Sequence, residues 1–126
     1  MYFSSRRTNV NWDVLCEQFC VENGISEITY MQAVGANDQR ALLRIEKKRK
    51  DAAKAMAAVK HAWQENPRAT QEQMRRKAYK FVTGGVILTL LLQVLLSATI
   101  KLAIDYFLDK LFSNKADDET LPVPAE

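Results

Sequence analysis

The sequence predicts an all-α protein, in which a helical N-terminal region with one long helix precedes a single transmembrane helix that an amphipathic segment extends. Residues 38–65 contain neither Gly nor Pro and are dominated by the helix formers Ala, Leu, Lys, Arg and Glu. Apolar side chains before and after this stretch recur every three or four residues, which is the helical period. Residues 81–100 carry no formal charge. These three observations define the expected architecture.

Charge is distributed unevenly along the 126 residues. Residues 1–80 hold fifteen Lys or Arg against nine Asp or Glu, whereas residues 81–126 hold three against six. We expect six segments: an N-terminal arm (1–10), a basic helical region (11–66), a juxtamembrane basic helix (67–80), a transmembrane span (81–100), an amphipathic extension (101–113) and a disordered acidic tail (114–126). No apolar run follows Arg6 and Arg7, so residues 1–10 do not resemble a signal peptide.

Two short segments open the basic region. Residues 11–23 predict a helix that Asn11 or Asn9 can cap. Residues 27–34 fit either a helix capped by Ser26 or a strand, because their apolar spacing suits both. Cys16 and Cys20 lie one turn apart on the apolar stripe of the first helix, where a disulfide has poor geometry. We therefore expect reduced thiols packed on a core face.

The long helix, from Asp38 to about Glu65 with Asn37 as its expected cap, carries a heptad-like apolar seam. Such a helix cannot bury enough apolar surface alone. The seam therefore predicts either packing against the first helix of the same chain or association with a second copy. Its apolar members are Leu42, Ile45, Ala52, Met56, Val59 and Trp63, and Arg49 interrupts them.

Pro67 predicts that this helix stops at Asn66. Thr70 and Gln73 then have the spacing of a capping box, which predicts the start of the last helix. That helix runs into residues 81–100, where Gln93 is the only amide side chain. Twenty helical residues cover roughly 30 Å, the thickness of the bilayer's hydrocarbon layer. The alternative is a buried central helix of a soluble bundle, for which a chain this short offers little surrounding core.

The flanks of the uncharged run fit a membrane interface. We expect seven residues to contact head groups there, the cations preferring anionic lipids: Arg75, Arg76, Lys77, Tyr79, Lys80, Lys101 and Tyr106. The excess of Lys and Arg before the run predicts a cytoplasmic N-terminus and a C-terminus on the opposite side.

Residues 101–113 keep a strong apolar face beyond the run. One arrangement is a continuous, straight helix from Gln71 to Phe112. The other is a bend near Lys101, after which the amphipathic part lies on the membrane interface or packs against protein. The strength of the apolar face favours the second arrangement.

No catalytic, cofactor-binding or metal-binding motif occurs in the sequence, and we expect neither an enzyme nor a cofactor. His61 is the only histidine, too few for a metal site with the two cysteines. The basic run 44–50 fits a solvated helix face or a surface held near anionic lipids. Nucleic-acid binding is not favoured, because aromatic residues are absent from this run and Glu46 and Asp51 dilute its charge.

A structural membrane protein that associates with itself, or with another membrane or capsid protein, is the expected function. In overall layout the chain resembles the small membrane proteins of tailless icosahedral bacteriophages with an internal lipid membrane: a short basic helical front, one span and an amphipathic extension. The resemblance implies many copies in a virion membrane beneath a capsid, with residues 1–80 facing the shell. The alternatives are a holin-like membrane-permeabilising protein and an adaptor subunit of a host membrane complex.

Overall fold

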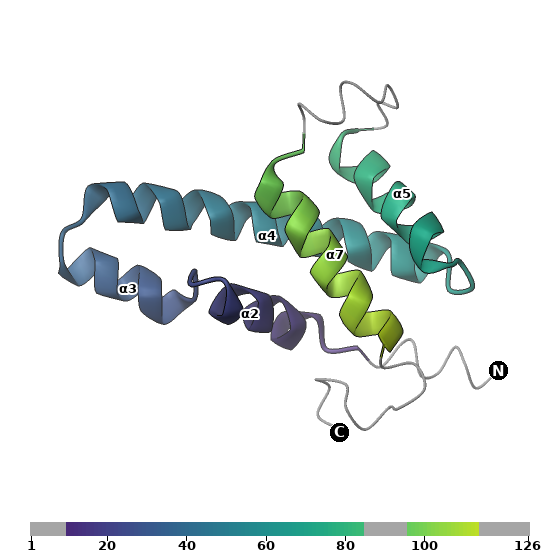
Figure 1. The fold of residues 1–126 in the computed structure, drawn as a ribbon, viewed down its shortest axis with the longest axis horizontal. Coiled ribbons are helices and arrows are strands. Elements are labelled where there is room, and N and C mark those ends of the chain that lie inside the picture. Colours follow the sequence, from purple (N-terminus) through teal and green to yellow (C-terminus); the bar gives the residue numbers. More distant parts are fainter. Residues whose placement is uncertain (1–9, 85–95, 114–126) are drawn as a thin grey trace.

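Helix α4 (Gln39–Glu65) is the spine of the molecule, and each of the other described helices contacts it (Figure 1). In this computed structural model, residues 10–84 and 96–113 are described. The other helices are α2 (Trp12–Glu22), α3 (Glu27–Gly35), α5 (Gln71–Val82) and α7 (Ala98–Ser113). No strand occurs in these two ranges, so the all-α prediction is confirmed there.

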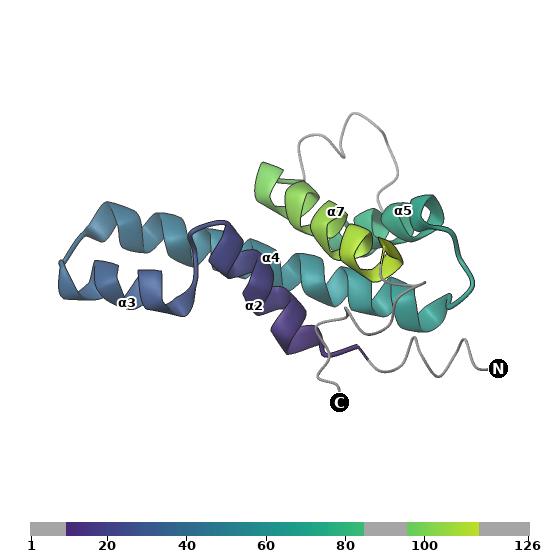
Figure 2. The same cartoon turned by 60° about the horizontal axis from the view of Figure 1, so that its bottom comes forward.

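The four shorter helices pack along the length of α4. Helix α3 runs alongside the N-terminal half of α4, whereas α5 and α7 pack on its C-terminal part, α7 crossing it at a steep angle (Figures 1 and 2). Helix α2 lies between these two groups and contacts both α4 and α7. The amphipathic segment 101–113 is therefore helical and packs against protein. Packing against protein was one of the two placements expected for this segment, the other being the membrane interface.

The core lies where α2, α4, α5 and α7 meet. The ring of Phe19 on α2 contacts that of Phe107 on α7 edge-on, with centroids 5.5 Å apart. Helix α4 presents small side chains to this core, which lets neighbouring backbones approach closely. Its fully buried alanines are Ala52, Ala55, Ala58 and Ala62.

Local capping explains most helix starts. The side chain of Asn11 accepts a hydrogen bond from the Val14 amide at 3.1 Å and begins α2, as predicted. The capping box of α5 is also confirmed: the Thr70 amide donates to Gln73 Oε1 at 2.9 Å, and the Gln73 amide donates to Thr70 Oγ1 at 3.1 Å.

The structure decides the nature of α3 and corrects the start of α4. The segment that fitted a helix or a strand is helix α3, capped by Ser26. Helix α4 is capped by Asp38, which accepts from the Ala41 amide at 3.1 Å, and not by Asn37 as expected. Asn37 instead adopts a left-handed conformation (φ +55°), which Asn tolerates better than most residues and which turns the chain between α3 and α4.

The structure excludes the first of the two arrangements considered, one continuous helix from Gln71 to Phe112. Helix α5 ends at Val82, Gly84 has a left-handed backbone (φ +72°), and α7 begins only at Ala98. Most of the predicted span, residues 85–95, lies outside the described residues, as do most of the N-terminal arm and the acidic tail. Among the helices that the structure describes, none combines the length and apolar character needed to cross a bilayer.

Candidate membrane-facing site

Helices α5 and α7 form an antiparallel pair. Gln71 Nε2 on α5 donates to Asp109 Oδ1 on α7 at 2.6 Å. One turn later along α5, Arg75 Nε donates to Asp105 Oδ1 at 2.9 Å, one turn earlier along α7. Because the contacts advance in opposite directions, the C-terminal end of α5 lies beside the N-terminal end of α7 (Figure 1). The two described ends of the predicted span are therefore neighbours.

Arg75 is held in place by contacts within this pair. Its guanidinium forms ion pairs with Asp105 of α7 and with Glu72 of its own helix. The hydrogen bond to Asp105 is the main reason why the pKa of Arg75 is raised. Of the seven predicted interface residues, Arg75 thus has a clear structural partner within the chain.

Exposed apolar and basic side chains gather at the adjacent ends of α5 and α7. Phe81 is 47% exposed and its ring stacks on that of His61, with centroids 4.7 Å apart, while Leu102 is 54% exposed. Cationic side chains flank both apolar ones. We call this set the α5–α7 end: Arg76, Lys77, Lys80, Phe81, Lys101 and Leu102, of which only Lys101 is half-buried.

A buried carboxylate fastens the start of α7 to α4. Asp51 on α4 is only 6% exposed, and its Oδ2 accepts a hydrogen bond from Ser97 Oγ at 2.9 Å. Ser97 Oγ in turn accepts from the Ile100 amide at 3.1 Å, which caps α7. Lys47 Nζ lies 3.4 Å from the same Asp51 oxygen. This network fixes the start of α7 against α4.

The two predicted interface tyrosines pack against the core of the chain. Tyr79 is half-buried against the core, and burial raises its pKa. The Tyr106 hydroxyl donates to Glu22 Oε2 on α2 at 3.0 Å, and its ring packs edge-on against Phe19. Burial, followed by the bond to Glu22, raises the pKa of Tyr106 to about 12. Both tyrosines contribute to packing between helices.

The predicted association seam of α4 faces the interior. Ile45, Ala52, Met56, Val59 and Trp63 are buried and Leu42 is half-buried, all within the core of the same chain. Of the two alternatives for the seam, packing within the chain is the one that this fold uses. The first helix is one of four partners that share this role.

Sequence reasoning missed Asp51 and Ser97. Ser97 precedes an amphipathic helical stretch, which is the usual signal of an N-cap, but the apolar run around it favoured a continuous helix. Asp51 gave no local signal of its contact with α7, because Ser97 lies 46 residues away. Within the described ranges, no group of three or more His, Cys, Asp or Glu side chains is placed to bind a metal ion.

The chain matches no protein-family model, and neither a curated protein nor a solved structure shows significant similarity to it. The fold and the α5–α7 end define a small helical protein with one basic, partly apolar end.

Proposed function

We propose that this chain is a structural membrane protein, attached to an anionic bilayer through the uncharged run that the α5–α7 end flanks. One observation carries the proposal: α5 and α7 bring both described ends of the run together and surround them with exposed apolar and cationic groups. Each Lys or Arg near an anionic surface contributes on the order of 1 kcal/mol to binding. Phe81 and Leu102 add apolar surface that could enter the head-group region.

The same contacts favour attachment from one face of the membrane. Eleven residues separate Gly84 from Leu96. Fully extended, they reach roughly 38 Å, whereas crossing the hydrocarbon layer and returning takes roughly 60 Å. While α5 and α7 remain paired, the chain on both sides of the run therefore stays at one face. A cytoplasmic N-terminus with the C-terminus opposite would need Arg75 to separate from Asp105 and Ser97 from Asp51.

Association with other copies or with a capsid protein remains part of the proposal, but the α4 seam does not support it. If the seam of α4 left the core of its own chain to pair with a second copy, Val59, Met56 and Trp63 would lose the contacts that now bury them. A partner of the folded chain would have to use another surface. Membership of a virion membrane is tested by identifying the chain in purified particles that have been stripped of their capsid.

Membrane attachment is tested by fractionation of cells that express the full chain. We expect the wild-type protein in the membrane pellet after alkaline carbonate extraction. Replacing Leu91 and Leu92 together by Lys should move it to the supernatant, because charged side chains enter the apolar part of a membrane only at a high cost in free energy. The control is Leu43→Lys, which changes a leucine on α4 that is 66% exposed and outside the run. A wild-type protein in the supernatant, or equal pelleting of all three, would contradict the proposal.

A further inference from the structure

Exposed apolar side chains gather on the part of the molecule that α5 and α7 leave uncovered. The hairpin of α3 and the N-terminal half of α4 projects beyond the core, and α2 lies beside its base (Figures 1 and 2). Five of the seven large apolar side chains that are exposed in the described ranges belong to this part: Val21, Ile28, Met31, Val34 and Leu43. No described helix covers this apolar surface.

The same part of the chain separates acidic from basic residues. Residues 10–38, which form α2 and α3, hold five Asp or Glu and neither Lys nor Arg. Residues 39–54, the first half of α4, hold seven Lys or Arg against two Asp or Glu. The ion pair Lys47–Asp51 lies within α4 itself. The carboxylates of α2 and α3 therefore have no cationic partner among the described residues.

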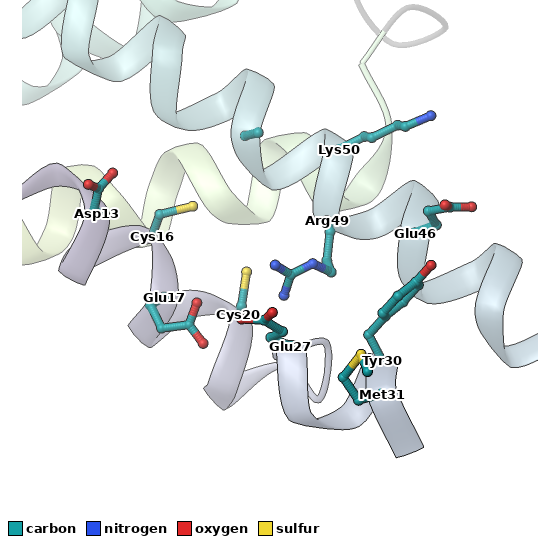
Figure 3. Close-up of a pocket in the computed structure, with 11 residues that line it drawn as sticks. Asp13, Cys16, Glu17, Cys20, Glu27, Tyr30, Met31, Glu46, Arg49 and Lys50 are labelled. Carbon is teal, nitrogen blue, oxygen red and sulfur yellow. The ribbon is translucent and has the colours of Figure 1, made fainter. Parts of the chain in front are cut away.

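A cavity of about 620 Å³ lies between α2, α3 and α4, and we call it the acidic cavity. Four exposed carboxylates line it: Asp13, Glu17, Glu27 and Glu46. Tyr30 and Met31 lie together on α3 and add apolar surface to its wall (Figure 3). Arg49 projects into the cavity, but its Nη1 already donates to the Ile25 carbonyl oxygen at 2.9 Å. Because the carboxylates outnumber Arg49 and Lys50, the cavity suits cationic side chains grouped around an apolar one.

A surface of that composition lies on α4. Four exposed residues, spaced by three, four and seven positions, share one side of this helix, and we call them the leucine stripe: Arg40, Leu43, Lys47 and Lys54. Leu43 is 66% exposed, and its neighbours in the stripe are all cations. The buried Ile45 points from a different side of α4 into the core of the chain. The stripe therefore contributes nothing to that core.

We propose that the acidic cavity of one copy of this chain receives the leucine stripe of a second copy. Leu43 of the second copy packs against Tyr30 and Met31, and the cations beside it face the carboxylates of the cavity. Charge complementarity selects this occupant, because docking brings together acidic and basic groups that a single chain keeps apart. Tyr and Met are also among the residues enriched at protein interfaces.

This inference rests on the self-association that the proposed function includes, and not on membrane attachment. The contact leaves the seam of α4 in the core of its own chain. Cavity and stripe are different surfaces, so a contact between two copies leaves one surface of each kind available. Further copies can then add until the arrangement closes.

Sedimentation equilibrium of the full chain, in a density-matched mild detergent, measures the association. We expect assemblies of two or more copies at about 0.05 M salt and weaker association at about 0.5 M, because salt screens exposed charges. A chain that is monomeric at both salt concentrations would overturn the proposal. This holds whether or not native mass spectrometry finds a lipid or a basic protein bound to it.

Leu43→Glu places a negative charge where the proposal puts an apolar side chain inside an acidic cavity. We expect it to weaken association by about tenfold or more. Gln64→Glu is the matched control, at an exposed position of α4 outside the stripe, and should associate like the wild type. Equal association of the two variants would contradict the docking. Both variants should remain in the membrane pellet after carbonate extraction, so that loss of association and loss of attachment are separate results.

Charge reversal tests whether the two surfaces bind each other. Glu17→Lys with Glu27→Lys reverses charge in the cavity, whereas Arg40→Glu with Lys54→Glu reverses it in the stripe. Each double variant alone should associate weakly. An equimolar mixture should associate again, because the first variant keeps an intact stripe and the second an intact cavity. If the mixture stays monomeric while both variants keep the wild-type circular-dichroism spectrum, the proposal fails.

Discussion

At the residue scale, the most consequential side chain is the buried Asp51. A carboxylate removed from water is costly unless hydrogen bonds or charges compensate it. Asp51 receives both, from Ser97 Oγ and from Lys47 Nζ. Because Ser97 also caps α7, one carboxylate links the spine helix to the residue at which the chain returns from the uncharged run.

Ser97→Ala should lower the free energy of unfolding by about 1–3 kcal/mol. The change removes the cap of α7 and leaves Asp51 with one partner fewer inside the protein. Urea unfolding followed by far-ultraviolet circular dichroism measures the loss. Ser113→Ala, at the exposed end of the same helix, is the matched control and should change little. Equal stabilities of the two variants would show that the Asp51–Ser97 contact does not hold α7.

Because of Tyr106, we expect the stability of the fold to depend on pH in the alkaline range. Its pKa of about 12 lies above the ordinary value near 10 because folding favours the neutral phenol. This contribution to stability is complete below pH about 10 and is lost as the pH rises toward 12. Glu22→Gln removes a neighbouring charge and should lower the pKa of Tyr106. An ultraviolet-absorbance titration measures this, with Tyr106→Phe identifying the transition; a transition unmoved by Glu22→Gln would contradict the assignment.

Most residues whose partners are close in sequence were predictable, Asp38 being the exception, and residues with distant partners were not. Asn11, Ser26 and the Thr70–Gln73 pair bond to groups three residues away, and all were expected as caps. Arg75 and Tyr106 looked like interface residues because cationic and aromatic side chains beside an uncharged run are typical of a membrane interface. Their actual partners, Asp105 and Glu22, lie 30 and 84 residues away, and only the tertiary fold brings them together.

At the element scale, the structure depends on how closely α5 and α7 approach α4. The buried alanines of α4 leave room for the neighbouring helices, and the larger seam residues fill the spaces between them. The heptad-like pattern was read correctly as a buried stripe. Its partner could not be read from the pattern, because a helix of the same chain and a helix of another copy satisfy the same spacing.

Ala58→Leu should destabilise the protein by about 1–3 kcal/mol, because a larger side chain at this fully buried position would overpack the core. Ala57→Leu is the matched control, since its neighbour Ala57 is exposed on the same helix. The measurement is again urea unfolding. Similar stability of the two leucine variants would mean that α4 does not pack against its neighbours as described.

Apolar composition explains why the sequence allowed a continuous helix from Gln71 to Phe112. Residues such as Ile104, Phe107 and Leu108 bury the same surface whether they face lipid or protein. The backbone conformation shows that the helix is interrupted. Gly84, with its left-handed conformation, follows the end of α5, and Ser97 caps the start of α7. The Gly84–Gly85 pair and a single Ser inside an apolar run are both tolerated in membrane helices, so neither was a sufficient signal.

At the scale of the whole molecule, the central claim is that the folded helices rest together at one face of a membrane. The pairing of α5 with α7 supports this claim, whereas the distribution of Lys and Arg in the sequence favours opposite sides for the two ends. These two features of the chain favour different topologies. A measurement of sidedness therefore separates them.

The direct test labels single cysteines with a membrane-impermeant maleimide, in intact cells and in inverted membrane vesicles. The two positions are Gln64→Cys on α4 and Ser113→Cys at the end of α7, each exposed and each placed in a Cys16→Ala, Cys20→Ala background. The one-face arrangement predicts that both cysteines are labelled from the same side of the membrane. Labelling of Gln64→Cys from one side and of Ser113→Cys from the other would contradict it and establish a single span.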